Sequence, residues 1–253
     1  MSSSWSQIWP LMVDTHCHPH DYPQPTLALE NSLSKGLVIH QMTISPEEYE
    51  SIRDQPIYQH EQLKLSLGLY PLEVDIQQEK LKRFLQLCPL QKFIGEIGLD
   101  YSTNDSKQQR AQEEALQTIL KTCHTLGNKV VSIHSRRAGE QILKACSDEF
   151  NGTLILHWFS GDIPESFIWP PHLYFSINTA MLKSRNGRKL LERLPLNRAL
   201  LESDGPYIKL NEQAVESWQL TSVLESLATR HKKTTLEIAQ QIHSNYIESC
   251  GNG

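Results

Sequence analysis

The amino-acid sequence predicts an α/β fold, a (β/α)8 barrel that forms a single domain over residues 1–253. Three observations support this: eight short apolar runs, helix-like segments between several of them, and metal-ligand side chains at the ends of five runs. The runs are rich in leucine and β-branched residues without strict alternation, as expected of strands buried on both faces. They are "LMVDTHCH", "GLVIHQMTIS", "LKLSLGLYP", "KFIGEIGLD", "KVVSIHS", "TLILHWFSG", "LYFSIN" and "RALLESDGP".

The clearest predicted helix covers residues 108–127, "QQRAQEEALQTILKTCHTLG". Its apolar residues form one helical stripe, and Gly127 supplies a stop. The stripe consists of Ala111, Ala115, Leu116, Ile119, Leu120 and Cys123. Two more helices are predicted at 211–231 and 234–250, and the second opens with a threonine cap. Alternating strands and helices indicate a parallel barrel.

The composition is that of an ordinary globular protein, with 39% hydrophobic and 21% charged residues. A net charge of −5 excludes a broad basic field for gripping long duplex DNA, but not local contacts to one strand end. The N-terminal stretch "MSSSWSQIWPLMV" does not resemble a signal peptide, and no window is apolar enough to span a membrane. We therefore expect a cytoplasmic protein without membrane contact.

Candidate metal ligands stand at the predicted strand ends. In a barrel these ends meet at one face, so the side chains should converge. They are His16 and His18 after strand one, Glu96 in strand four, His134 in strand five, His157 in strand six and Asp204 after strand eight. His16 and His18 are two positions apart and can point toward one ion, although such a pair also suits a polar corner.

Each candidate also has a structural interpretation. Glu96 follows "FIG" in a predicted core run, where a carboxylate needs a partner; that partner is either a salt bridge or metal ions. Gly95 and Gly98 leave room for close approach. His134 and His157 follow aliphatic residues and could be core histidines. Asp204 precedes a Gly-Pro corner and could stabilise the turn.

The ligand types predict metal-assisted hydrolysis. Imidazole and carboxylate together suit zinc, manganese or nickel, while carboxylate and water suit magnesium. Ions in such a site lower the pKa of a bound water and neutralise charge on the leaving oxygen. We expect two divalent ions, with Mg²⁺ in use and Mn²⁺ or Zn²⁺ as alternatives.

With these residues assembled, the sequence resembles the TatD-related metal-dependent deoxyribonucleases over about residues 12–247. The resemblance rests on "DTHCH", "GEIGLDY", "IHSR", "HWFSG" and "ESDGPY", in that order. It implies that His16, His18, Glu96 and Asp204 hold one ion, while Glu96, His134 and His157 hold the second.

The resemblance also implies a 3′-5′ exonuclease that hydrolyses phosphodiester bonds of DNA, with single strands or 3′ ends as partners. Asp204 would then orient or deprotonate the attacking water. Arg136 or Arg137 would meet negative charge on the phosphoryl oxygens. The details "SIHSRRA", "HWFSG" and "SDGP" resemble the TatD-like component of bacterial Qat antiphage defence systems, which implies antiviral defence and companion proteins.

The sequence departs from the family pattern after strand three. Family members usually carry Gly-x-His-Pro there, whereas this chain reads "GLYP" and offers Tyr70. A phenol can hydrogen-bond a phosphate but is a poor proton acceptor near neutral pH, because its reference pKa is about 10. Tyr70 is therefore predicted to bind substrate. Its presence puts a family-like reaction rate, or a family-like substrate, in question without removing any metal ligand.

Two alternative functions remain open from the sequence. The same barrel and ligands serve amidohydrolases and phosphoesterases of small molecules, although Glu96 stands where many amidohydrolases carry a carbamylated lysine. A weakly active binding subunit of a defence complex is the second alternative. Trp158 and Phe159 could stack on a nucleobase or belong to the core, and Glu202 could tune a ligand or form a salt bridge inside the barrel.

Overall fold

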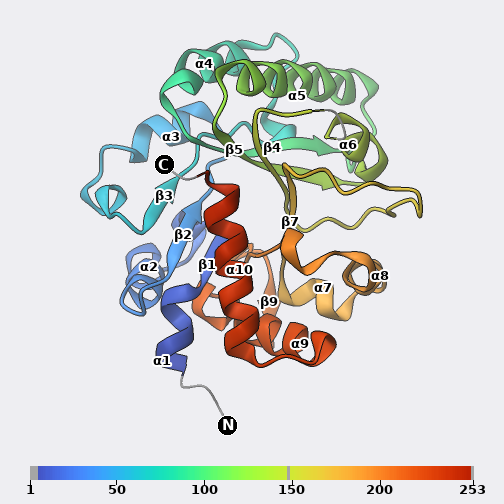
Figure 1. Cartoon of the computed structure of the whole chain (residues 1–253). Helices are drawn as coiled ribbons and strands as arrows, with labels where there is room; N and C mark the ends of the chain where they lie inside the picture. The colour runs from blue at the N-terminus through green and yellow to red at the C-terminus, as the bar shows by residue number, and fades with distance from the viewer. Residues whose placement is uncertain (1–4, 147–148, 252–253) are drawn as a thin grey trace.

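The computed structural model describes residues 5–146 and 149–251, and it shows a ring of parallel strands with helices on its outside (Figure 1). Residues 1–4, 147–148 and 252–253 of the predicted domain 1–253 lie outside the described residues. The ring strands are β1 Val13–Cys17, β2 Val38–Gln41, β3 Leu63–Leu65, β4 Phe93–Asp100, β5 Lys129–Arg136, β6 Gly152–Leu156, β7 Leu173–Ile177 and β8 Ala199–Leu201. Each lies inside one of the eight predicted runs or extends one residue beyond it, which confirms the α/β barrel class.

The ring consists of two sheets that meet at two seams. Strands β1, β2 and β3 form one sheet, and β4 to β8 form the other, each strand pairing with its sequence neighbour. At the first seam, an isolated parallel bridge joins Leu67, just after β3, to Ile94 of β4. The amide of Leu67 donates to the carbonyl of Phe93 at 3.1 Å, so the backbone continues across this seam.

The second seam, between β8 and β1, is closed by both backbone and side-chain hydrogen bonds. Beyond β8, the Asp204 amide donates to the His16 carbonyl at 2.9 Å. Asp14, fully buried in β1, accepts the Ser203 amide at 2.9 Å and the Ser203 hydroxyl at 2.5 Å. Asp14 therefore fixes the segment that carries Asp204 against the strand that carries His16.

Helices cover the outside of the ring. They are α1 Trp5–Ile8, α2 Pro25–Leu33, α3 Pro46–Ile52, α4 Glu79–Leu87, α5 Ser106–Leu126, α6 Gly139–Ala145, α7 Thr179–Lys183, α8 Arg185–Arg193, α9 Thr221–His231 and α10 Thr235–Ser249. Short 3₁₀ turns occupy Trp9–Leu11, Pro19–Asp21, Pro56–Gln59, Pro71–Glu73, Cys88–Leu90, Leu196–Arg198 and Ser217–Leu220. Among the described residues, no helix combines the length and the apolar character needed to cross a membrane.

Helix α5 shows why the helical prediction succeeded. Every residue of its predicted apolar stripe is buried against the core, because the stripe follows the 3.6-residue period. Asp105 caps its first turn by accepting the Lys107 amide at 2.8 Å. Gly127 ends it with a φ of 70°, a conformation that glycine adopts at little cost.

Two local predictions were wrong. The predicted helix 211–231 starts ten residues later, at Thr221 (221 − 211 = 10), after a 3₁₀ turn. Asn211 and Glu212 instead have positive φ and form the turn between β9 (Lys209–Leu210) and β10 (Gln213–Ala214). The connection 158–172, between β6 and β7, is irregular where strand–helix–strand alternation predicted a helix. Pro164, Pro170 and Pro171 explain this, because proline cannot donate a helical hydrogen bond.

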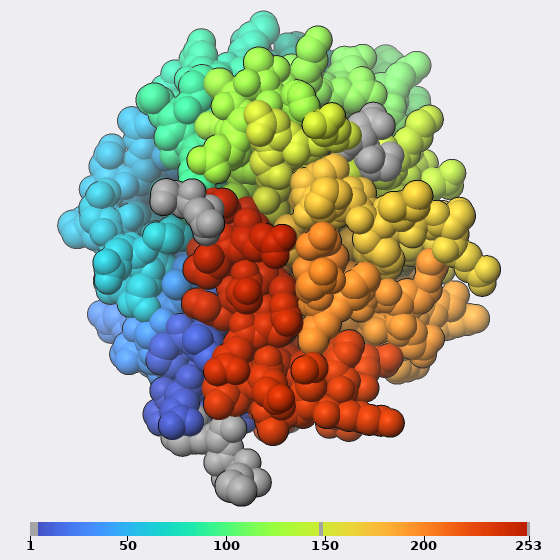
Figure 2. Space-filling model, viewed as in Figure 1, coloured from blue at the N-terminus to red at the C-terminus, as the bar shows by residue number. Residues whose placement is uncertain are grey.

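Helix α10 closes the amino end of the barrel. It crosses the centre of the face shown in Figures 1 and 2. Tyr246 of α10 packs in a cluster with residues near the starts of the strands, among them Val13, Val130 and Leu200. The carboxyl ends of the strands therefore open at the opposite end of the barrel, where the predicted ligands converge.

Candidate metal centre

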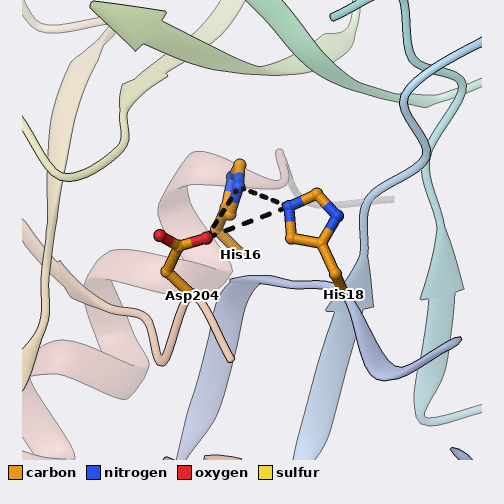
Figure 3. A group of neighbouring side chains, drawn as sticks. All are labelled: His16, His18 and Asp204. Carbon is orange, nitrogen blue, oxygen red and sulfur yellow. Dashed lines mark hydrogen bonds and ion pairs between the residues drawn. The ribbon is translucent and has the colours of Figure 1, made fainter. Parts of the chain in front are cut away.

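His16, His18 and Asp204 converge where β1 meets the segment after β8 (Figure 3). His16 lies in β1 and His18 directly follows it, so the two-residue spacing turns both imidazoles to one side, as predicted. The Nε2 atoms of His16 and His18 are 3.3 Å apart. Asp204 Oδ1 lies 3.7 Å from the first and 3.9 Å from the second. Three donor atoms therefore face a common point.

Glu96 presents one carboxylate oxygen to this group and the other to a second group. Its Oε2 lies 3.5 Å from Nε2 of His18 and 3.9 Å from Nε2 of His16. Its Oε1 lies 2.6 Å from Nδ1 of His134 and 2.8 Å from Nε2 of His157. Those two nitrogens are 3.1 Å apart. Ligands held ~2.0–2.2 Å from one ion lie ~3–4 Å from one another, so the first group has ligand-like spacing. In the second group, Oε1 of Glu96 lies at hydrogen-bond distance from both nitrogens.

The placement of Glu96 differs from its predicted position at the end of strand four. Strand β4 continues to Asp100, and Glu96 lies in its middle, where the register with β5 shifts between Ile94 and Ile97. Gly98 lets the strands approach closely, because a Cβ there would lie 2.2 Å from the His134 carbonyl oxygen. The flanking glycines thus make room for neighbouring backbone and side chains.

Three of the four imidazoles of this centre are neutral near pH 7, the exception being His134. Burial lowers the pKa of His18 to about 4 and also lowers the pKa of His157. Burial and the neighbouring His157 lower the pKa of His16 well below its ordinary value. A neutral imidazole keeps a lone pair for a metal ion, so these three side chains are ready to bind near pH 7.

The carboxylates need a positive partner. Burial would raise the pKa of Glu96, but His157 and His134 hold it well below its ordinary range. Asp204 lacks such support, so burial and then Glu202 and Glu96 raise its pKa well above the usual value. A buried carboxylate held among other carboxylates is stabilised by a cation. The donor set as a whole therefore fits divalent metal.

Comparison with known proteins identifies the family. A family model described as "TatD related DNase" matches residues 13–250. The chain belongs to the TatD-related DNase family. The metal-dependent hydrolase YjjV of Escherichia coli (strain K12) is 28% identical over 92% of this chain and 95% of its own. Its crystal structure matches the TatD-type barrel with a TM-score of 0.75, at 24% identity, covering 94% of this chain and 96% of that one.

Two further TatD-related relatives carry more specific names. Human "Deoxyribonuclease TATDN3" is 24% identical over 86% of this chain and 86% of its own. The "3'-5' ssDNA/RNA exonuclease TatD" of Enterobacter lignolyticus (strain SCF1) is 34% identical over 52% of each chain. Family and fold together make this chain a TatD-related, metal-dependent hydrolase.

In this TatD-related chain, a second carboxylate orients His134. Asp100 is fully buried at the end of β4, and its Oδ2 lies 3.1 Å from Nε2 of His134. The hydroxyl of Tyr70 donates to the same oxygen at 3.0 Å. Asp100 was not predicted from the sequence, although it stands in "GEIGLDY" at an even spacing from Glu96. That spacing was the available signal, because alternate residues of a strand share a face.

Ser132 and Glu202 lie next to two histidines of the centre. The hydroxyl of Ser132, another residue missed from the sequence, lies 2.7 Å from Nδ1 of His16 and fixes that ring. Glu202 was predicted to tune a ligand or to form a salt bridge inside the barrel; its Oε2 lies 3.7 Å from Nδ1 of His157, and burial together with the charge of Glu202 raises the pKa of Asp204. Glu202 also accepts hydrogen bonds from Ser176, Asn178 and the Trp158 amide.

A cavity of about 740 Å³ opens onto the centre. Tyr70 and Arg136 line it, together with Trp158 and Tyr207. Arg137, predicted beside Arg136 as a substrate contact, is exposed but is not among the described residues that line this cavity. Of the two arginines, Arg136 is therefore the one placed to meet an anionic substrate in the cavity.

Proposed function

We propose that this TatD-related hydrolase is a deoxyribonuclease that trims DNA from the 3′ end with two divalent ions. The proposal rests on the position of Glu96, because its two carboxylate oxygens face two separate groups of donor atoms. Two-metal hydrolases hold their ions ~3.5–4 Å apart, a spacing that one bridging carboxylate suits. The printed names of TATDN3 and the Enterobacter TatD exonuclease support DNA as the substrate.

The ligand assignment follows the two donor groups. His16, His18, Asp204 and Oε2 of Glu96 would hold one ion, while Oε1 of Glu96, His134 and His157 would hold the second. Bound divalent ions supply a water of lowered pKa and neutralise charge on the phosphoryl oxygens.

Protein side chains would supply the remaining chemistry. Asp204 would orient the attacking water and accept its proton, since its carboxylate stands at the edge of the first donor group. Arg136, on the cavity wall, would bind phosphoryl oxygens, because a guanidinium matches their geometry. Tyr70 would hold Asp100 through its hydroxyl and contact substrate from the cavity wall.

A cleavage time course tests the proposed function. Single strands labelled at the 5′ end are incubated with purified protein and Mg²⁺, Mn²⁺ or chelator. We expect a metal-dependent ladder that shortens from the 3′ end, and a loss of at least ~1000-fold in Glu96→Ala, because the bridging group supplies several kcal/mol.

Glu73→Ala is the matched control, because Glu73 lines the same cavity but lies outside both donor groups. Near-normal cleavage by Glu96→Ala in the presence of metal would overturn the bridging role. Metal binding without cleavage of any strand would point to a small-molecule hydrolase or to a binding subunit.

We also infer a role in antiphage defence, with companion proteins, in the cytoplasm. The support is the resemblance of "SIHSRRA", "HWFSG" and "SDGP" to the TatD-like component of Qat systems. In cells that carry the chain with its neighbouring genes, we expect phage plaques to be reduced, and Glu96→Ala to restore plaque number. Equal protection by Glu96→Ala would separate defence from hydrolysis and favour the binding-subunit alternative.

A further inference from the structure

We propose that Trp158 forms a stacking site for the terminal nucleobase of the substrate strand, with Tyr207 as a second aromatic wall. This inference rests on the proposed nuclease function and names the part of the nucleotide that the cavity recognises. Trp158 directly follows His157, and Tyr207 lies three positions after Asp204. Both side chains line the cavity, so each ring stands beside a proposed metal ligand.

Trp158 is turned toward the cavity by its backbone. It has a φ of 38°, a left-handed conformation that costs a bulky residue ~1–3 kcal/mol and clusters at functional sites. The surrounding structure holds this conformation, because the Trp158 amide donates to Oε1 of the fully buried Glu202 at 2.8 Å. Asn178 donates to the same oxygen at 2.7 Å and keeps the carboxylate in place.

Phe159, the next residue, differs from Trp158 in being part of the core. Its ring is fully buried and packs edge-to-face on Phe175 at 5.5 Å between centroids. The Trp158 side chain is 36% exposed. For both aromatics the sequence left stacking and core packing open. In the structure Phe159 is a core residue and Trp158 lines the cavity.

Tyr207 is held just as firmly and is more exposed, at 57%. Its hydroxyl donates to Asp21 at 2.6 Å, and its ring stands edge-on to the His18 ring at 5.1 Å between centroids. The hydroxyl and the ring therefore both have contacts that orient the side chain in the cavity wall. An oriented aromatic face suits binding of a flat ring.

The chemistry of the neighbouring donor groups identifies the ligand as a nucleobase. If the metal centre cleaves the last phosphodiester, the nucleoside attached to that phosphate must lie against the walls next to the ligands. Aromatic side chains bind bases by stacking, at ~1–3 kcal/mol per base and without sequence preference. A paired terminal base is held by its partner strand and by the base it stacks on, so it must unpair before it can enter the cavity and stack on Trp158; this site therefore favours an unpaired 3′ end.

A double-mutant cycle tests the stacking. We compare kcat/KM for removal of a normal 3′-terminal nucleotide and of an abasic one, in wild type and in Trp158→Ala. We expect wild type to prefer the normal terminus by about 5- to 150-fold, which is ~1–3 kcal/mol converted at 1.4 kcal/mol per factor of ten. Trp158→Ala should lose this preference, Tyr207→Ala should lose part of it, and Trp158→Phe should retain most of it.

Ile168→Ala is the control, because Ile168 is an exposed apolar residue of the same β6–β7 connection that does not line the cavity. Cleavage of both termini at equal rates by wild type would overturn the stacking proposal and leave the nuclease function standing. If no DNA is cleaved, fluorescence of 2-aminopurine at the 3′ end provides a separate readout without divalent ions. Quenching in wild type that Trp158→Ala abolishes supports stacking, and absence of quenching refutes it.

Discussion

Tyr70 acts on His134 through a single carboxylate oxygen. The Tyr70 hydroxyl and Nε2 of His134 both hydrogen-bond to Oδ2 of Asp100. The other oxygen of Asp100, Oδ1, accepts the Ser102 amide at 2.8 Å. Burial would lower the pKa of His134, but Glu96 and Asp100 raise it to about 9, so the metal-free ring carries a proton on each nitrogen. A metal ion would replace the proton on Nδ1, and Asp100 would retain the proton on Nε2.

The first prediction concerns this chain of hydrogen bonds. Asp100→Asn should weaken binding of Mn²⁺ by about 10- to 100-fold, and Tyr70→Phe by a smaller factor in the same direction, because both loosen the ring that binds metal. Tyr70→His should retain affinity, since imidazole can also donate to Asp100. Isothermal titration measures the affinities.

A different result would reassign Tyr70. If Tyr70→Phe bound Mn²⁺ as tightly as wild type but raised KM for DNA, the phenol would serve the substrate alone. That outcome would support the role predicted from the sequence, in which Tyr70 hydrogen-bonds a phosphate.

At the scale of elements, α10 is tied to β2 through a buried histidine. Nε2 of His40 lies 3.0 Å from the hydroxyl of Tyr246, and the imidazole stands edge-on to Phe93. Burial, and to a lesser extent Lys64, lowers the pKa of His40 to about 3. His40 carried no ligand-like context in the sequence, and it is a core residue that stays neutral in the folded protein.

The second prediction concerns the pH dependence of this contact. A histidine in the unfolded chain titrates near pH 6.5. The contribution of the buried, neutral His40 to the free energy of unfolding is therefore fully present above that pH and is lost as the pH falls toward 3. The loss should follow a slope of about 1.4 kcal/mol per pH unit, one proton being bound on unfolding. His40→Gln should reduce the slope of the free energy of unfolding between pH 6 and 4 by this amount, measured by urea denaturation.

His60→Gln is the matched control, because His60 is exposed. It should leave the slope unchanged. Equal slopes for wild type and His40→Gln would mean that His40 becomes protonated in the folded protein, contrary to its burial.

Elements with a strong local pattern could be predicted, and those set by distant contacts could not. The strand runs and the α5 stripe are visible in the sequence because burial on both faces or on one stripe selects the residue types. The late start of α9 depends on the Asn211–Glu212 turn, whose conformation the sequence pattern did not reveal. The convergence of Asp100 and Ser132 on ligands depends on strand pairing, which no single run encodes.

At the scale of the whole molecule, the donor groups join the two sheets. His16 and His18 come from the sheet β1–β3, whereas Glu96, His134 and His157 come from the sheet β4–β8 or its end. An ion bound by both sets therefore holds the sheets together as well as serving the chemistry. The free energy of unfolding should therefore increase when metal is bound.

The third prediction is a metal-dependent rise in Tm. An ion present at about 100 times its Kd adds about 2.7 kcal/mol. That corresponds to about 5–10 °C, at about 2–4 °C per kcal/mol for a chain of this size. Scanning calorimetry with Mn²⁺ and with chelator measures the rise, which Glu96→Ala should lose and Glu73→Ala should keep. An equal rise in Glu96→Ala would place the stabilising ion elsewhere.

The β8–β1 seam also has a consequence for biosynthesis. Asp14 and Ser203 are separated by 189 residues, so their hydrogen bonds can form only when nearly the whole barrel has left the ribosome. The strands of each sheet pair with sequence neighbours and can assemble earlier, since short loops cost less entropy to close. A nascent chain therefore carries His16 and His18 without Asp204 beside them until that residue has been synthesised, so the proposed first group of donor atoms is completed late in translation of the barrel.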